Sequence, residues 1–259
     1  MNASISIRPE PVLRGDYSRA HPVDFVVEQD MNQYSPEEHA RWAALFHRQK
    51  MAAGKFGSSL FNQALQRLEQ ASPLHKGIPC LTDFNPTLLQ HTGWKLVAVP
   101  GLIPDKVFFE HLAKRQFPVT TWIRGAHEMD YIVEPDIFHD FFGHVPLLID
   151  SAIADFLHWY GKQANQANGD DLKKLARLYW YTIEYGLVKE GNAIKTFGAG
   201  LLTSRTELEH SVLCLPKHTQ FNVDKVLQSD YAIDTFQTKY FVLEDFHELL
   251  RLNNLAQYE

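Results

Sequence analysis

The sequence predicts a mainly α-helical domain with a few short strands. The clearest helical signal is at residues 172–191, where apolar side chains recur at the three- and four-residue spacing of one helix face. The run Ser35-Pro36-Glu37-Glu38 is a capping box with proline at the first helical position, so we expect a helix from there to about residue 53. Two short apolar runs, at 94–99 and 117–123, predict strands.

The other elements follow from caps, turns and apolar periodicity. Helices are expected at 58–70, 85–90, 105–116 and 244–255, a strand at 240–242, and a polar loop at 163–170 that contains the turn pair Asn168-Gly169. Beyond residue 204 the chain is expected to be structural, with Glu207, Glu209 and His210 solvated.

Length and composition favour one large domain. The chain has 259 residues, of which 45% are hydrophobic, enough to bury a sizeable core. Residues 1–30 contain Pro9, Pro11, Gly15 and Pro22 with little periodicity, which indicates an irregular N-terminal arm. Since no composition break or long linker follows, we expect a single domain at 31–259.

Charge and hydropathy argue against several classes of protein. The formal net charge of −6 gives no sign of nucleic acid or an anionic membrane as a partner. The chain lacks a run of about 20 apolar residues and a basic N-terminal region followed by an apolar core, so we expect a soluble, cytoplasmic protein. Cys80 and Cys214 form no CxxC pair and are expected to be buried thiols in a reducing compartment.

Residues 134–146, EPDIFHDFFGHVP, set two histidines and three carboxylates among large apolar side chains. Burying such polar groups costs free energy unless they are paired or bind a metal. Pro135 and Gly143 predict the start and the end of a short helix, and unwinding at Gly143 would bring the rings of His139 and His144 together. Two convergent imidazoles suit a transition metal. A capped surface helix is the plainer alternative.

A third ligand is expected on the helix at 172–191. Glu184 lies on its apolar face, next to Ile183 and one turn from Trp180, where an unpaired carboxylate would be strongly disfavoured. A salt bridge or a metal would remove that cost, and a position at the border of the apolar stripe is the alternative. Two histidines and one carboxylate are the ligands of non-haem iron(II) oxygenases and of some zinc hydrolases, and spacing does not separate the two.

Three segments carry a resemblance to a known family. They are residues 129–147 (MDYIVEPDIFHDFFGHVPL), 178–187 (LYWYTIEYGL) and 197–202 (FGAGLL). Together they closely resemble the pterin-dependent aromatic amino acid hydroxylases, with particular likeness to the short bacterial phenylalanine 4-hydroxylases. The likeness runs from about Tyr34 to Phe246 with coherent order and spacing, and it implies the family's catalytic-domain fold for 31–259.

The resemblance implies hydroxylation of L-phenylalanine to L-tyrosine by O2, with two electrons from tetrahydrobiopterin or a related tetrahydropterin. It also implies that His139, His144 and Glu184 hold catalytic iron(II). Tyrosine or tryptophan hydroxylation within the family is the nearest alternative, followed by a zinc hydrolase with the same ligands and a sensor of aromatic amino acids. The chain ends without a heptad repeat, so we expect a monomer or dimer rather than a coiled-coil tetramer.

Binding roles outside the metal ligands also come from the resemblance. For the amino acid, the implied residues are Arg124, which would bind the α-carboxylate, with Pro135, Trp180, Gly200 and Thr203 around the pocket. For the pterin they are the loop residues Gly101, Leu102 and Ile103, Phe108 as a stacking ring, and Glu134, Asp140 and Tyr179. Thr203 would also be the hydrogen-bond partner of His139; many relatives carry serine there.

Overall fold

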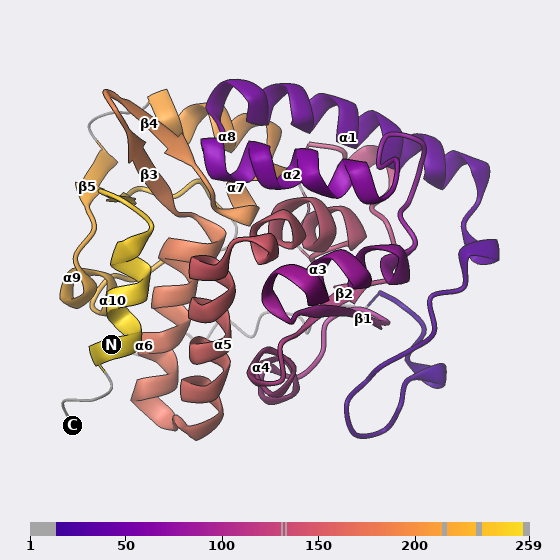
Figure 1. Cartoon of the computed structure of the whole chain (residues 1–259), viewed down its shortest axis with the longest axis horizontal. Helices are drawn as coiled ribbons and strands as arrows, with labels where there is room; N and C mark the ends of the chain where they lie inside the picture. Colours follow the sequence, from indigo (N-terminus) through magenta and orange to yellow (C-terminus); the bar gives the residue numbers. More distant parts are fainter. Residues whose placement is uncertain (1–13, 131, 133, 214–216, 232–234, 256–259) are drawn as a thin grey trace, which may run out of the picture.

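The computed structural model describes residues 14–130, 132, 134–213, 217–231 and 235–255. Helices dominate these residues, and short strands form two small sheets (Figure 1), so the predicted mainly α-helical fold is confirmed. Within these ranges, no helix combines the length and the apolar character needed to cross a bilayer. Cys80 is a half-buried free thiol, and the predicted thiol of Cys214 lies outside the described residues.

The first two long helices begin at the caps that the sequence predicts. α1 (Pro36–Phe56) starts with the complete capping box, in which the side chains of Ser35 and Glu38 each accept the other residue's backbone N–H. α2 (Ser59–Ala71) follows the N-cap residue Ser58. Both helices cross the top of the molecule in Figure 1.

A parallel pair of strands brings two chain segments to one edge. β1 (Lys95–Val99) pairs with β2 (Gln116–Thr120), with Val99 opposite Thr120, and α4 (Asp105–Ala113) makes the crossover between them. α4 ends sooner than predicted because the chain turns directly into β2. Since the carboxyl ends of parallel strands lie at the same edge, the loop after β1 and the backbone at Thr120 face the same region.

α5 (Ser151–Gln166) and α6 (Gly169–Tyr179) form a helical pair (Figure 1). The predicted loop at 163–170 is too long, since α5 continues to residue 166 and only 167 and 168 lie between the helices. Gly169 begins α6 with a φ of +52°, a left-handed conformation that glycine adopts at little cost. The tight turn keeps the two helices together.

A four-stranded sheet follows, in the order β4-β3-β6-β5. Its strands are β3 (Leu187–Glu190), β4 (Ala193–Thr196), β5 (His218–Gln220) and β6 (Tyr240–Leu243). The predicted helix over 172–191 is wrong beyond residue 184, because β3 pairs with β4 on one side and β6 on the other, where Leu187 and Val188 are buried. The predicted strand at 240–242 is confirmed.

The remaining α-helices are α3 (Asn85–Thr92), α7 (Ala199–Thr203), α8 (Arg205–Leu213), α9 (Val223–Leu227) and α10 (His247–Leu255). A continuous hydrophobic cluster extends from Trp42 to Leu252. Its aromatic centre joins Trp42 of α1 to Phe138 and Phe141, with ring centroids 5.3 and 5.9 Å apart. The segment that carries the two histidines is therefore held against α1 by its apolar side.

Candidate metal centre

Both histidines lie on a π-helix, η5 (His139–His144). The predicted start at Pro135 and stop at Gly143 are wrong, because the helix begins at residue 137 and continues through Gly143 without a break. In a π-helix the hydrogen bonds run from residue i to i+5, which adds one residue to each turn. Residues five apart therefore take the relation that residues four apart have in an α-helix. His139 and His144 point to the same side without any unwinding.

Gly143 permits close packing rather than ending the helix. A Cβ at this position would lie 2.8 Å from the Cβ of Ala199 and 3.1 Å from its Cα. α7 therefore approaches η5 more closely than any side chain at residue 143 would allow. This contact carries Thr203, at the end of α7, to the ring of His139.

Glu184 ends a second π-helix, η7 (Trp180–Glu184), which continues α6. The backbone N–H of Tyr185 donates to the carbonyl of Trp180 at 2.8 Å, which is the i to i+5 bond of this geometry. Gly198 lets α7 approach here too, since a Cβ on it would lie 2.4 Å from the carbonyl oxygen of Glu184. Two π-helices, both packed on α7, thus deliver the three polar side chains.

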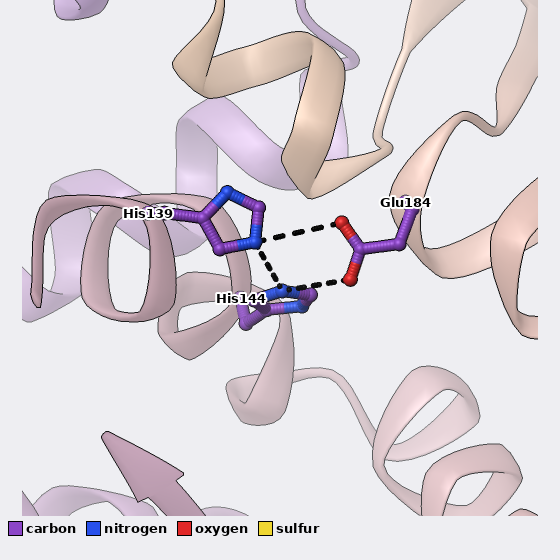
Figure 2. A group of neighbouring side chains, drawn as sticks. All are labelled: His139, His144 and Glu184. Carbon is purple, nitrogen blue, oxygen red and sulfur yellow. Dashed lines mark hydrogen bonds and ion pairs between the residues drawn. The ribbon is translucent and has the colours of Figure 1, made fainter. Parts of the chain in front are cut away.

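The side chains of His139, His144 and Glu184 converge on one point (Figure 2). The two Nε2 atoms are 3.3 Å apart, and Glu184 places Oε2 3.5 Å from His139 Nε2 and Oε1 3.2 Å from His144 Nε2. Such a set on one side of an ion leaves its remaining coordination positions open. In the described part of the chain, this is the one group of histidines and acidic residues with metal-site geometry.

Thr203 fixes the tautomer of His139. Its hydroxyl donates to the carbonyl of Ala199 at 2.7 Å, so the oxygen is left to accept from His139 Nδ1–H, 3.1 Å away. The lone pair of His139 is then on Nε2, which faces the other two ligands. Burial lowers the pKa of His139 to about 4, so the ring stays neutral, as a metal ligand must.

Glu184 supplies the negative charge of the group. Burial acts to raise the pKa of its carboxyl, but the neighbouring histidines and the backbone N–H of Gly200 outweigh this effect, and the pKa lies below its ordinary value. A carboxylate at this largely enclosed position, with two imidazole rings as its neighbours, is a group that a divalent cation would stabilise. The chemistry of the donor set therefore fits a divalent transition metal.

Arg124 and Asp136 form a buried ion pair beside this centre. Asp136 accepts hydrogen bonds from Arg124 Nε at 2.9 Å and Nη2 at 2.8 Å, whereas the buried Nη1 has no hydrogen-bond partner among the described residues. The sequence signal for Asp136 is weak, because twelve residues separate the partners and a carboxylate at a helix start is common. Its only distinctive feature is its apolar surroundings.

Two cavities meet at His139 and Glu184, and His144 lines the smaller of them. The smaller, of about 180 Å³, has in its lining Gly101, Leu102, Ile103, Phe108, Asp140 and Tyr179. The larger, of about 440 Å³, has in its lining Arg124, Pro135, Trp180, Gly200, Thr203 and Glu207. His139 and Glu184 line both, so a bound ion would be accessible from either side. A more voluminous surface depression, of about 790 Å³, contains none of these residues.

The chain matches the biopterin-dependent aromatic amino acid hydroxylases over residues 18–258. This match covers nearly the whole sequence, including both π-helices. The chain belongs to this family. The predicted pterin-dependent enzyme acting on an aromatic amino acid is thereby confirmed.

Bacterial phenylalanine-4-hydroxylases are among the similar members of the family. The enzyme of Chromobacterium violaceum is 45% identical over 93% of this chain and 81% of its own length. That of Mesorhizobium japonicum is 46% identical over 95% of this chain and 89% of its own length. A crystal structure of the C. violaceum enzyme with bound iron(III) and 7,8-dihydrobiopterin superposes with a TM-score of 0.84 at 43% identity, covering 92% of this chain and 87% of that one.

In this hydroxylase the smaller cavity combines an aromatic wall with the half-buried acid Asp140. Phe108 meets Tyr179 edge to face, with centroids 6.1 Å apart. Asp140 accepts the backbone N–H of Thr120 at 2.8 Å, and burial raises the pKa of its carboxyl to about 7. Glu134 differs from the other predicted pterin residues, because it is not in the lining of either cavity and accepts the backbone N–H of Arg14 instead.

The larger cavity of the hydroxylase is bordered by a stack of aromatic rings. Trp180 stacks on Tyr185 and on Tyr231, with centroid distances of 4.6 and 4.4 Å. Its indole N–H donates to the side chain of Gln237 at 3.1 Å. The two stacked rings and this hydrogen bond together fix the orientation of the indole at the cavity wall.

Glu207 is not solvated, contrary to expectation. It is only 3% exposed, and its Oε1 accepts the backbone N–H of Gln237 at 2.9 Å and the hydroxyl of Tyr240 at 3.0 Å. Burial raises the pKa of this carboxyl, against the opposing effect of its hydrogen bonds and of Lys217. Glu207 holds the backbone of Gln237, and the side chain of Gln237 in turn accepts the indole N–H of Trp180. Local sequence gives no sign of this, because both partners lie about 30 residues further on.

Proposed function

We propose that the chain is a phenylalanine 4-monooxygenase that converts L-phenylalanine to L-tyrosine. One oxygen atom of O2 enters the ring, and a tetrahydropterin supplies two electrons and leaves as a hydroxypterin. The observation that carries this proposal is the convergence of His139, His144 and Glu184 between two cavities. Identity of 45–46% to two enzymes named phenylalanine-4-hydroxylase supports phenylalanine as the substrate.

His139, His144 and Glu184 would hold iron(II). The ion, with the pterin, would supply the activation of O2 that no protein side chain provides. Iron(III) bound to the C. violaceum relative supports iron as the metal. Thr203 would keep His139 in the ligating tautomer, and the buried surroundings would exclude competing water.

On the amino acid side, Arg124 would bind the substrate carboxylate through Nη1. Asp136 occupies the other edge of the guanidinium, so the free edge has a fixed direction. The aromatic ring would be confined by four residues that line this cavity: Pro135, Trp180, Gly200 and Thr203. Confinement determines which ring carbon faces the metal.

On the pterin side, the backbone of Gly101, Leu102 and Ile103 would bind the edge of the bicyclic ring and Phe108 would stack on its face. Asp140 and Tyr179 would complete this wall beside the metal. Glu134 would act indirectly, by accepting the backbone N–H of Arg14 while packing against Gly101 of the loop.

The proposed setting is a cytoplasmic monomer or dimer with one catalytic domain at 31–259. The free thiol of Cys80 is in keeping with a reducing compartment. A hydrophobic cluster that runs from Trp42 to Leu252 supports a single domain.

The decisive experiment measures tyrosine and O2 together. Protein stripped of metal is reloaded with iron(II) or, as a control, zinc, and is given phenylalanine and tetrahydrobiopterin in air. Tyrosine formed in proportion to O2 with iron but not with zinc is the expected result. Consumption of O2 and pterin without tyrosine would point to tyrosine or tryptophan as the substrate, and no consumption would contradict the proposal.

A further inference from the structure

The N-terminal arm touches the loop proposed to bind the pterin. Gly15, at a φ of +109°, packs so tightly that a Cβ on it would lie 2.0 Å from the carbonyl oxygen of Pro100. A Cβ on Gly101 would lie 2.4 Å from the carbonyl oxygen of Arg14 and 2.7 Å from the hydroxyl of Tyr17. Two glycines thus let the backbones of arm and loop meet without side chains between them.

Polar contacts fasten the arm to this loop. The hydroxyl of Tyr17 donates to the carbonyl of Leu102 at 2.9 Å. The backbone N–H of Arg14 lies 3.4 and 3.3 Å from the two carboxylate oxygens of Glu134. The same carboxylate lies against the loop, since a Cβ on Gly101 would lie 3.4 Å from Glu134 Oε1, so one side chain contacts both the arm and the loop.

The side chain of Arg14 anchors the arm at a second place. Its Nη1 is 2.7 Å from Glu128 Oε2, and its other terminal nitrogen contacts the second oxygen of the same carboxylate. The guanidinium also lies over the ring of Trp122, 5.0 Å from the centroid. Glu128 and Trp122 lie in the segment that follows β2, beside Arg124, so the arm spans two parts of the site.

Leu102 is the residue where this attachment matters. It lines both the cavity that contains Phe108 and the cavity that contains Arg124. Its side chain is 40% exposed, so packing alone does not hold it. The arm instead fixes its backbone, by the hydrogen bond from Tyr17 to the carbonyl and by the packing of the arm and Glu134 against the neighbouring Gly101.

We propose that residues 14–17 are a strap that holds the loop at Leu102 in its pterin-binding conformation, with Tyr17 as a positioning residue. The inference rests on the proposed function in one respect, that this loop binds the pterin. A loop held in its binding conformation before the ligand arrives saves the cost of ordering it on binding. Loss of the strap weakens pterin binding and leaves amino acid binding and the maximal rate nearly intact.

Two variants of the iron-loaded full chain test the strap. Tyr17→Phe removes one hydrogen bond, and the KM for tetrahydrobiopterin is expected to rise by about 3- to 10-fold. Gly15→Ala keeps every polar group but forces a Cβ onto a backbone carbonyl, and an increase of about 10-fold is expected. In both, the KM for phenylalanine and kcat at saturating pterin should stay within about twofold of wild type.

Matched controls separate the strap from general damage. Ser18→Ala removes a hydroxyl that bonds Asp16 within the arm, and Gly54→Ala adds a Cβ that meets nothing within 4 Å. Neither should change the KM for pterin. Calorimetry with 7,8-dihydrobiopterin measures pterin binding without turnover, and its dissociation constants should rank the variants in the same order as their KM values for pterin.

The outcomes distinguish this inference from the proposed function. If the wild type makes tyrosine and both arm variants keep its pterin affinity, the strap is wrong and the enzyme assignment stands. Parallel losses in both substrates' KM values and in kcat would mean a merely structural arm and would also contradict the strap. A wild type that neither binds pterin nor makes tyrosine would contradict both.

Discussion

The carboxylate of Asp136 accepts hydrogen bonds from Arg124, at Nε and Nη2, and from the backbone N–H of His139 at 2.9 Å. One buried acid therefore orients the proposed carboxylate anchor and the first turn of the metal-binding helix together. Because Nε and Nη2 are both used, the selectivity of Arg124 for a ligand depends on a single remaining edge.

Arg124→Lys should raise the KM for phenylalanine. A lysine has one nitrogen and cannot keep both bonds to Asp136 while presenting another donor to the substrate. Hydrogen bonds to charged groups contribute about 1.5–3 kcal/mol, so an increase of about 10- to 100-fold is expected, with a much smaller change in kcat. Arg115→Lys, at a surface ion pair with Asp155, is the control. Steady-state kinetics decide, and an unchanged KM would remove Arg124 from its proposed role.

Glu184→Gln should impair metal retention. The amide removes the charge that balances the cation, and a loss of at least about 10- to 100-fold in iron affinity is expected, with loss of tyrosine formation coupled to pterin oxidation. Iron per chain after gel filtration is the measurement. Glu190→Gln, at an exposed carboxylate that bonds Ser59, should retain iron as the wild type does. Full iron content and activity in Glu184→Gln would exclude it as a ligand.

Thr203→Val and Thr203→Ser should differ sharply. Valine keeps the shape but removes the acceptor for His139 Nδ1–H, whereas serine keeps the hydroxyl. Loss of a partner that orients a metal ligand commonly costs about 10- to 100-fold in metal affinity or activity. The metal affinity, measured by titration, and kcat should therefore fall in the valine variant and be largely retained in the serine variant. Full metal affinity and kcat in the valine variant would exclude the hydroxyl as the group that orients His139.

Glu207→Gln should change how stability depends on pH. The folded chain raises the pKa of this carboxyl above 4.5, so the folded state binds the proton more tightly than the unfolded state does. The wild type then loses stability as the pH rises from 4.5 through the folded-state pKa. Glutamine can still accept from Gln237 and Tyr240 but carries no charge, so its stability relative to wild type should increase over that window.

Denaturant unfolding at both ends of the window tests this directly. Glu209→Gln, an exposed position on the same helix, is the control and should show a weaker dependence on pH. A stability difference between Glu207→Gln and wild type that falls as the pH rises would show that ionised Glu207 is stabilising instead. Lys217, a described cation that lowers the pKa of Glu207, would then be the first residue to substitute.

Local signals predicted most of the scaffold. The capping box at Ser35, the proline-led helix at residue 85 and the strands at 95 and 116 depend on neighbouring residues alone, and the structure has them near the expected places. The metal ligands were predictable for a different reason. A charged side chain among apolar residues needs a salt bridge or a metal to offset the cost of burial. The resemblance of the motifs to the family indicated a metal.

Distant contacts account for what local signals missed. Residues 187–190 carry a helical pattern but form β3, because strands from residues 193 and 240 pair with them on either side. Glu207 is buried by partners about 30 residues away. The π-helices have no signature of their own in the sequence, since each is little more than one turn long and cannot set up an apolar period of its own.

A bound ion would join parts of the chain that are far apart in sequence. Its ligands lie on either side of the helical pair formed by α5 and α6, with His144 before it and Glu184 after it. The metal would therefore act as a removable crosslink that closes this loop, with an effect comparable to that of a disulfide but set by free metal concentration. At about 100 times its dissociation constant, such a ligand adds about 2.7 kcal/mol to folding stability. The resistance of this enzyme to unfolding would then be governed by the cell's iron supply.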